Sequence, residues 1–270
     1  MIYYISIIAS GGVFVAGNNK KIRFYAAETA KNTLNLGENR LKLVVCIMIC
    51  AVATVLAWLM SDLSYVTLEA FGVSASAAYY STTFAVTVIF WLLLAAPLYM
   101  GTFKIALRML RGESTEIADI FDVFASPSDR RRAFALSFSL LWRILPIIVV
   151  CSFTAEVNLI AEIAELSPAL VSIVNTAFVP ALVLSLAFAA SQLGFISFAY
   201  TEERVSVRTA IKKARKARKG NCKSVFALAT LTLLKLLLSL LTLGILTVIH
   251  TLPMALLTYG AMAQELKDHL

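Results

Sequence analysis

The sequence predicts an all-α, polytopic membrane protein with six transmembrane helices and short cytoplasmic amphipathic helices. The 270 residues are 60% hydrophobic and only 15% charged, and their mean hydropathy is +0.82. A soluble domain is about 45–50% apolar and about 25% charged. Several uncharged runs also reach the roughly 20 residues that a helix needs to cross the hydrocarbon core of a bilayer. This composition leaves no room for a soluble catalytic domain.

The predicted spans follow the apolar runs in order along the chain. Residues 1–21 are predicted as an apolar N-terminal extension, which is either a short anchor or an interfacial or disordered segment, and residues 22–270 as a single six-helix membrane domain. Pro97 has no N–H to donate, so it predicts a kink near Leu93 in the second span. The six expected spans are 43–60, 79–103, 134–153, 177–200, 225–242 and 245–264.

The apolar residues from 225 to 263 admit two interpretations. The favoured one is a pair of helices that turn around Gly244. The alternative is one helix from 236 to 260 with Lys235 at the interface, which would place the C-terminus outside. His250 lies in this stretch without ligand spacing to any Cys, Asp or Glu, so we expect a hydrogen-bonded structural histidine.

The basic residues are distributed unevenly between the two sides of the predicted topology. Of the 24 Lys and Arg residues, 22 fall in segments predicted to be cytoplasmic, and the predicted outer loops hold none. Such an excess is typical of cytoplasmic loops. The pattern predicts a multi-pass protein of the cell membrane, with both termini cytoplasmic if residues 1–16 do not span. The outer loops instead carry the acids Asp62, Glu69, Glu156, Glu162 and Glu165.

The most basic stretch, "AIKKARKARKGNCKS" at 210–224, leads directly into the fifth span. It predicts a cytoplasmic helix and turn that anchors this span. Anionic headgroups would contribute roughly 1 kcal/mol per basic residue close to the surface. Because the charges lie beside apolar runs, the predicted partner is a bilayer with anionic lipids and not nucleic acid. The expected headgroup surface consists of Lys212, Lys213, Arg215, Lys216, Arg218 and Lys219.

The fourth span carries small residues at a spacing of three or four. Ala187, Ala190 and Gly194 would lie on one helix face, where small side chains allow two helices to approach closely in lipid. We expect a packing contact within the chain, with a membrane-protein partner, or with a second copy.

The loop between the second and third spans predicts a short amphipathic helix. Ser114 is the expected N-cap. The apolar face would consist of Ile117, Ile120, Phe121 and Phe124, at i, i+3, i+4 and i+7. The carboxylates of Glu116, Asp119 and Asp122 would form a solvated face or pair with the Lys and Arg of 208–219.

Three polar residues are predicted within spans: Arg143, Lys235 and Gln192. Counted from the cytoplasmic helix ends, all three would lie roughly 12–15 Å deep, where an Arg or Lys costs about 2.5–3.5 kcal/mol. In one interpretation Lys235 extends along its stem toward the cytoplasm, and Arg143 donates to the carbonyl of Trp142 freed by Pro146. In the other, the three converge on a cavity that holds an anionic group such as a lipid phosphate.

Three stretches carry a resemblance to a known family: "AAETAKNTLNLGENRLKLVV", "MGTFKIALRMLRGESTEIADIFDVF", and "AIKKARKARKGNCKSVFALATLTLLKLLLSLLTLGIL" with "LPMALLTYGAMAQEL". They resemble the bacterial integral membrane proteins catalogued as domain of unknown function 975. The resemblance covers about residues 22–266. It implies a six-helix protein of the cytoplasmic membrane and supplies no activity.

The sequence contains no recognisable catalytic or metal-binding motif. The four cysteines have no CxxC spacing, and nucleotide-binding and zinc-protease motifs are missing. We therefore expect no enzymatic activity, no cofactor and no metal. The favoured function is structural or regulatory in the cytoplasmic membrane. The alternative is a carrier or binder of an anionic lipid or small anionic metabolite, which a polar cavity between the helices would favour.

Overall fold

The computed structural model describes residues 19–70, 85–139, 141–142, 187, 191, 205–219, 221–242 and 244–268, and every regular element within them is a helix. Three helices are long and apolar enough to cross a membrane: Asn39–Met60, Ala85–Leu110 and Cys222–Ser239. They correspond to the predicted first, second and fifth spans. Six spans are not confirmed, because most of the predicted third and fourth spans lies outside the described residues and 245–264 is not among the three.

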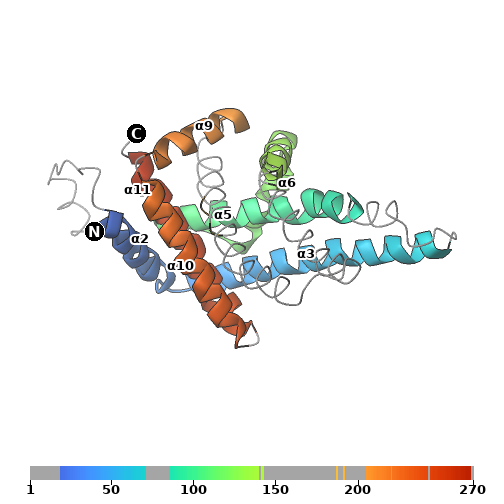
Figure 1. Ribbon diagram of the computed structural model, residues 1–270, viewed down its shortest axis with the longest axis horizontal. Helices are drawn as coiled ribbons and strands as arrows, with labels where there is room; N and C mark the ends of the chain where they lie inside the picture. Colours follow the sequence, from blue (N-terminus) through green and yellow to red (C-terminus); the bar gives the residue numbers. More distant parts are fainter. Residues whose placement is uncertain are drawn as a thin grey trace, which may run out of the picture.

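Two long antiparallel helices form one half of the described structure (Figure 1). α3 (Asn39–Ala70) lies beside a helix that starts at 85 and continues through η1 (Trp91–Ala95) into α5 (Ala96–Leu110). Between them, Cys50 Sγ lies 3.3 Å from Thr102 Oγ1, and Thr54 Oγ1 lies 3.3 Å from Tyr99 Oη. Small polar side chains of this kind hold helices together where the surroundings are apolar.

The second helix is irregular at the place that Pro97 predicts. η1 is a π-helical turn, and the N–H of Ala96 donates to the carbonyl of Trp91, five residues earlier. Pro97 cannot donate to the carbonyl of Leu93, which lies at the centre of this turn. A π-turn is one way in which a helix absorbs such a missing hydrogen bond.

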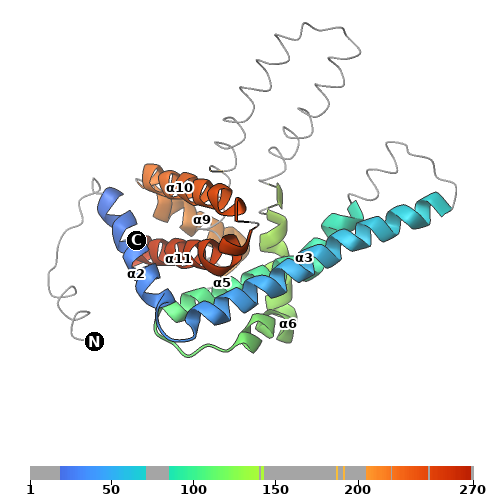
Figure 2. The ribbon, with the colours of Figure 1, turned by 90° about the horizontal axis from the view of Figure 1, so that it is seen from below.

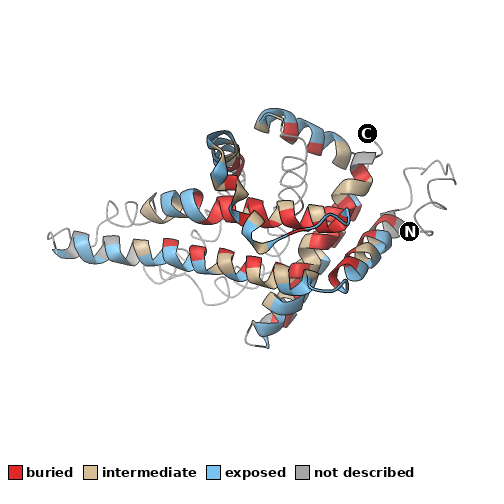
Figure 3. Cartoon of the chain, turned by 180° about the vertical axis from the view of Figure 1, so that it is seen from behind, coloured by how far each residue is buried: buried red, intermediate tan, exposed pale blue. Residues whose placement is uncertain are grey.

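Figure 3 shows the buried residues gathered where α2 (Asn19–Leu34), the first half of α3, α5 and α11 (Leu252–Asp268) meet. α2 packs along α11 and buries one residue in every four. The far end of α3 remains exposed at Trp58, Leu63 and Val66. The buried stripe of α2 consists of Ile22, Ala26, Ala30 and Leu34.

The last part of the chain forms a helical hairpin. α10 (Cys222–Leu240) is followed by a turn in which Gly244 has φ +77°, then by η3 (Thr247–Thr251) and α11. The favoured two-helix interpretation is confirmed, and the single helix from 236 to 260 is wrong because the chain reverses inside that range. The hairpin crosses the α3–α5 pair steeply in Figure 1, and in Figure 2 it lies near the start of α3, while the rest of α3 extends away from it.

The amphipathic segment after α5 differs from its prediction. It begins as a 3-10 helix, η2 (Ile117–Phe121), and ends as α6 (Asp122–Ala125). Because a 3-10 helix has three residues per turn, the buried side follows the spacing of Ile120 and Val123, and Phe121 is 50% exposed. The expected apolar face was therefore wrong at Phe121. The N-cap is Glu116 and not Ser114.

This segment lies directly on the backbone of α5. A Cβ atom built on Gly101 would meet the carbonyl oxygen of Ile120 and would lie 3.0 Å from its carbonyl carbon. Only glycine allows the two backbones to approach this closely. Gly101 thus fixes where η2 sits.

Candidate anion-binding groove

A hydrogen bond between two side chains sets the register of the α10–α11 hairpin. Ser239 Oγ lies 2.6 Å from Thr247 Oγ1. Nearer the turn, Thr242 Oγ1 donates to the carbonyl of Ser239 at 2.6 Å, and the N–H of Leu246 donates to Thr242 Oγ1 at 3.3 Å. These bonds close the turn and define which residues of the two helices face each other.

The second helix of the hairpin begins with a π-turn. In η3 the N–H of Leu252 donates to the carbonyl of Thr247, and Thr251 Oγ1 donates to the carbonyl of Leu246 at 3.3 Å. Pro253 follows immediately, so the carbonyl of Ile249 has no ordinary helical donor. The extra residue in this turn determines which side chains of η3 and α11 face α10.

A groove of about 590 Å³ lies between α10, η3–α11 and α2. Ligand-binding clefts have volumes of about 300–1,000 Å³, so this groove can hold a small organic molecule. Its walls are mostly apolar. The lining residues are Leu228, Leu231, Thr232, Lys235, Leu238 and Ser239 from α10, Leu246, His250, Thr251, Met254, Ala255 and Thr258 from the second helix, and Arg23, Phe24 and Ala27 from α2.

The ionisable side chains that line the groove are all of the basic residue types. Lys235, His250 and Arg23 line it, and the described residues that line it include no Asp or Glu. Lys235 on α10 lies one helical turn from Ser239, on the side away from Gly244. His250 and Thr251 on η3 lie one turn from Thr247 in the same direction. The two basic side chains therefore lie at the same level of the hairpin.

Lys235 lies farther along its helix than the sequence predicted. α10 begins at Cys222 and ends at Leu240, so Lys235 is about 20 Å from the start of the helix and about 8 Å from its end. The helix starts at Cys222 and not at 225, which moves Lys235 three residues farther from its start; its depth in a bilayer stays a prediction. The shorter path for the ammonium group leads toward the Gly244 turn, not toward the start of the helix at Cys222.

His250 is exposed, and its ring makes no hydrogen bond within the described part of the chain. The hydrogen bond expected for this histidine is not found among the described residues. The participation of His250 and Arg23 in the groove was missed. His250 lies three residues before Pro253, and that proline was the available signal, since a proline-induced irregularity changes the helix face on which His250 lies.

The structure tests only part of the predicted polar set. Lys235 lines the groove, whereas Arg143 and Gln192 lie outside the described residues, so their convergence with Lys235 stays a prediction. The predicted packing face is likewise described only in part. Ala187 is fully buried, and Ala190 and Gly194 lie outside the described residues.

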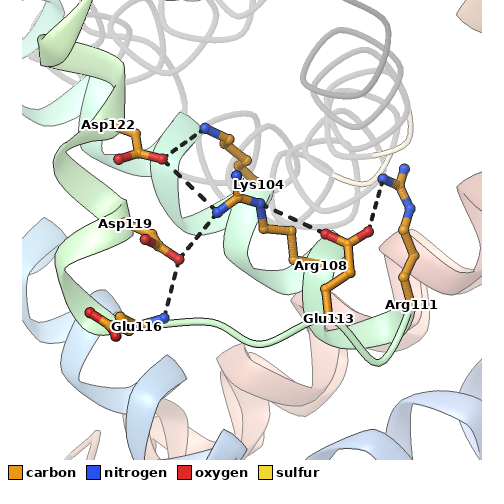
Figure 4. A network of polar contacts seen from close by, with 7 residues as sticks. All are labelled: Lys104, Arg108, Arg111, Glu113, Glu116, Asp119 and Asp122. Atoms are coloured by element: carbon orange, nitrogen blue, oxygen red, sulfur yellow. Dashed lines mark hydrogen bonds and ion pairs between the residues drawn. The ribbon is translucent and has the colours of Figure 1, made fainter.

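The carboxylates of the η2–α6 segment pair with α5 (Figure 4). Lys104 Nζ lies 3.0 Å from Asp122 Oδ2, and Arg108 Nη1 lies 3.2 Å from Asp119 Oδ2. Asp119 Oδ2 also accepts the N–H of Glu116 at 3.1 Å. The expected pairing with the Lys and Arg of 208–219 is wrong for these two carboxylates, since Lys104 and Arg108 are closer in sequence and face the segment from one side of α5.

A second contact ties the same loop to α3. Lys42 Nζ donates to the carbonyl of Thr115 at 3.0 Å and lies 3.5 Å from Glu38 Oε2. The start of α3, the end of α5 and the η2–α6 segment therefore form one connected unit. Its charged groups neutralise one another, so this network is structural.

The basic stretch forms α9 (Val207–Arg218) and a turn, as expected. Ser206 caps the helix by accepting the N–H of Thr209 at 3.3 Å. Ala210 and Ala214 are buried, and α9 packs against α11. The predicted headgroup residues Lys212, Lys213, Arg215, Lys216 and Lys219 are exposed, and Arg218 is half-buried.

No family model, curated protein or solved structure matches this chain. The function of the protein is therefore inferred from its own residues, and the groove is the part of the described structure whose chemistry is most specific.

Proposed function

We propose that this chain is a multi-pass membrane protein that binds an anionic group, a phosphate or a carboxylate, in the groove between α2, α10 and η3–α11. The observation that carries the proposal is the pair Lys235 and His250 on a mostly apolar wall whose described residues include no carboxylate. The three helices that are long and apolar enough to cross a membrane support a membrane location.

The energetic argument concerns Lys235. An ammonium group in the hydrocarbon of a bilayer is costly, about 2.5–3.5 kcal/mol at the centre of a span and less toward its ends, and Lys235 makes no ion pair within the described residues. A bound anion would offset this cost, since charges attract more strongly where water is excluded. His250 adds a ring nitrogen that can donate to the same anion.

The proposed role is binding or carriage and not catalysis. The groove offers cationic and hydroxyl groups but no acid–base pair. The resemblance to domain of unknown function 975 belongs to the same proposal and adds a cytoplasmic-membrane location. Binding of an anion in the groove is compatible with a regulatory or structural role of the protein in that membrane.

Native mass spectrometry of the full chain, purified in a mild detergent, tests the proposal. We expect the unaltered protein to retain an anionic compound. Lys235→Gln and His250→Gln should each reduce that retention, and the double variant should abolish it, because each change removes one side chain that faces the anion.

Lys216→Gln is the matched control, since it removes one charge from the exposed face of α9 and leaves the groove intact. This variant should retain the compound. Equal retention by the unaltered protein and the folded double variant would refute the proposed function.

A further inference from the structure

The groove extends well beyond Lys235 and His250 at the hairpin end. Along α10 it runs from Leu228 to Ser239, a length of about 16 Å. Lys235 and His250 occupy one part of this length. The remainder is bounded by side chains such as Leu231, Met254 and Ala255. A free phosphate or small carboxylate would leave this apolar part empty.

Three of the four hydroxyl groups that line the groove are already hydrogen-bonded to carbonyls of their own helices. Ser239 Oγ donates to the carbonyl of Leu236 at 2.8 Å, Thr251 Oγ1 to that of Leu246 at 3.3 Å, and Thr258 Oγ1 to that of Met254 at 2.7 Å. These groups therefore present mainly methyl and methylene surface to an occupant. Such a wall favours a hydrocarbon chain over a polar metabolite.

The edges of the groove are formed by exposed leucines. Leu231, Leu238 and Leu246 are 49%, 66% and 49% exposed. All the lining residues of α10 belong to the candidate span Cys222–Ser239. In a bilayer these leucines would contact acyl chains, so a ligand would enter sideways from the lipid.

These observations, together with the proposed function on which the inference rests, identify the class of ligand. We infer that the occupant is a phospholipid whose headgroup carries a net negative charge. Its phosphate lies against Lys235 and His250, and one acyl chain lies along the wall formed by Met254, Ala255 and Ala27. The small side chains of Ala27 and Ala255 leave the room that this chain occupies.

Binding to the full chain in detergent, measured with three probes, tests the inference. The probes are long-chain phosphatidylglycerol, long-chain phosphatidylcholine and glycerol phosphate, which is the soluble anionic part alone. Phosphatidylglycerol should bind at least about tenfold more tightly than either other probe, because it alone supplies both the charge and the chain. Ala255→Leu should weaken the binding of phosphatidylglycerol by about tenfold and leave the affinity for glycerol phosphate unchanged.

Two further variants keep the result interpretable. Ala27→Leu fills the same part of the groove from α2 and should act like Ala255→Leu, which covers the case in which one of them fails to fold. Ala227→Leu changes a half-buried α10 residue outside the groove and should leave all three affinities unchanged.

The outcomes separate this inference from the proposed function. If glycerol phosphate binds as tightly as phosphatidylglycerol, and both alanine-to-leucine variants in the groove bind normally, the site takes a soluble anion and the lipid inference is wrong. If no anionic probe depends on Lys235, both the inference and the proposed function fail.

Discussion

The hydroxyl oxygens of Ser239 and Thr247 lie 2.6 Å apart across the α10–α11 hairpin. These residues are eight positions apart in sequence, which would separate them by about 12 Å along a continuous helix. Their contact therefore requires the reversal at Gly244. It also brings Lys235 and His250 to the same level of the groove.

Ser239→Cys combined with Thr247→Cys should form a disulfide in a background that lacks the native cysteines. The two side chains already meet across the hairpin at 2.6 Å, so cysteines at these positions can pair with a small adjustment of the backbone. Mass spectrometry of the peptides after mild oxidation measures the bond. Leu238→Cys with Thr247→Cys is the control, because Leu238 is 66% exposed and should stay reduced. A continuous helix would leave both pairs reduced.

Gly101→Ala should lower the stability of the protein, although such a change inside a helix normally stabilises by about 0.5–1 kcal/mol. The new methyl group would meet the backbone of Ile120, and overpacking typically costs about 1–3 kcal/mol. Thermal unfolding in detergent measures the effect, and Gly101→Ser should be worse than Gly101→Ala. A raised unfolding midpoint for Gly101→Ala would show that η2 does not lie on α5 as described.

Asp119→Asn should destabilise the η2–α6 segment by about 1 kcal/mol. The Oδ2 atom of Asp119 accepts from both the Glu116 N–H and Arg108, and the neutral amide weakens both bonds. Asp129→Asn is the comparison and should have little effect, because among the described residues Asp129 makes no hydrogen bond or ion pair with η2 or α5. Equal midpoints for the two variants in thermal unfolding would contradict a structural role for the network in Figure 4.

Local features of this fold were predictable where one residue determines them. Pro97 marks the irregular turn at Trp91–Ala95, and Gly244 marks the hairpin reversal, because each acts through its own backbone geometry. The basic helix α9 is likewise local. Each of these features depends on a few neighbouring residues.

Features that depend on tertiary contacts were not predictable in the same way. Phe121 was expected on the buried face, but a 3-10 helix changed the period from 3.6 to 3.0 residues per turn. The partners of Asp119 and Asp122 are set by how η2 lies on α5. The groove needs α2, far away in sequence, to supply Arg23, and no sequence period indicates that arrangement.

The predicted topology can be tested by cysteine labelling in intact cells. In a background without native cysteines, Lys216→Cys should be protected from a membrane-impermeant reagent, and Glu162→Cys should react with it. The reason is the concentration of basic residues on the predicted cytoplasmic side. Labelling at position 216 from outside, in unbroken cells, would overturn the orientation.

The central claim is that the groove holds an anionic lipid, and site-specific photocrosslinking tests it most directly. The full chain would carry p-benzoylphenylalanine in place of Leu231, which lines the groove, or in place of Leu237, which does not. The two leucines are equally exposed, at 49%, so both would meet the surrounding bilayer. The vesicles would contain equal amounts of phosphatidylglycerol and phosphatidylcholine.

Mass spectrometry of the crosslinked peptides then gives the lipid composition at each position. At 231 the account predicts adducts strongly enriched in phosphatidylglycerol, and Lys235→Gln should remove that enrichment. At 237 the adducts should match the bulk lipid mixture. The same unselective mixture at both positions, in protein that is folded and inserted, would contradict the account.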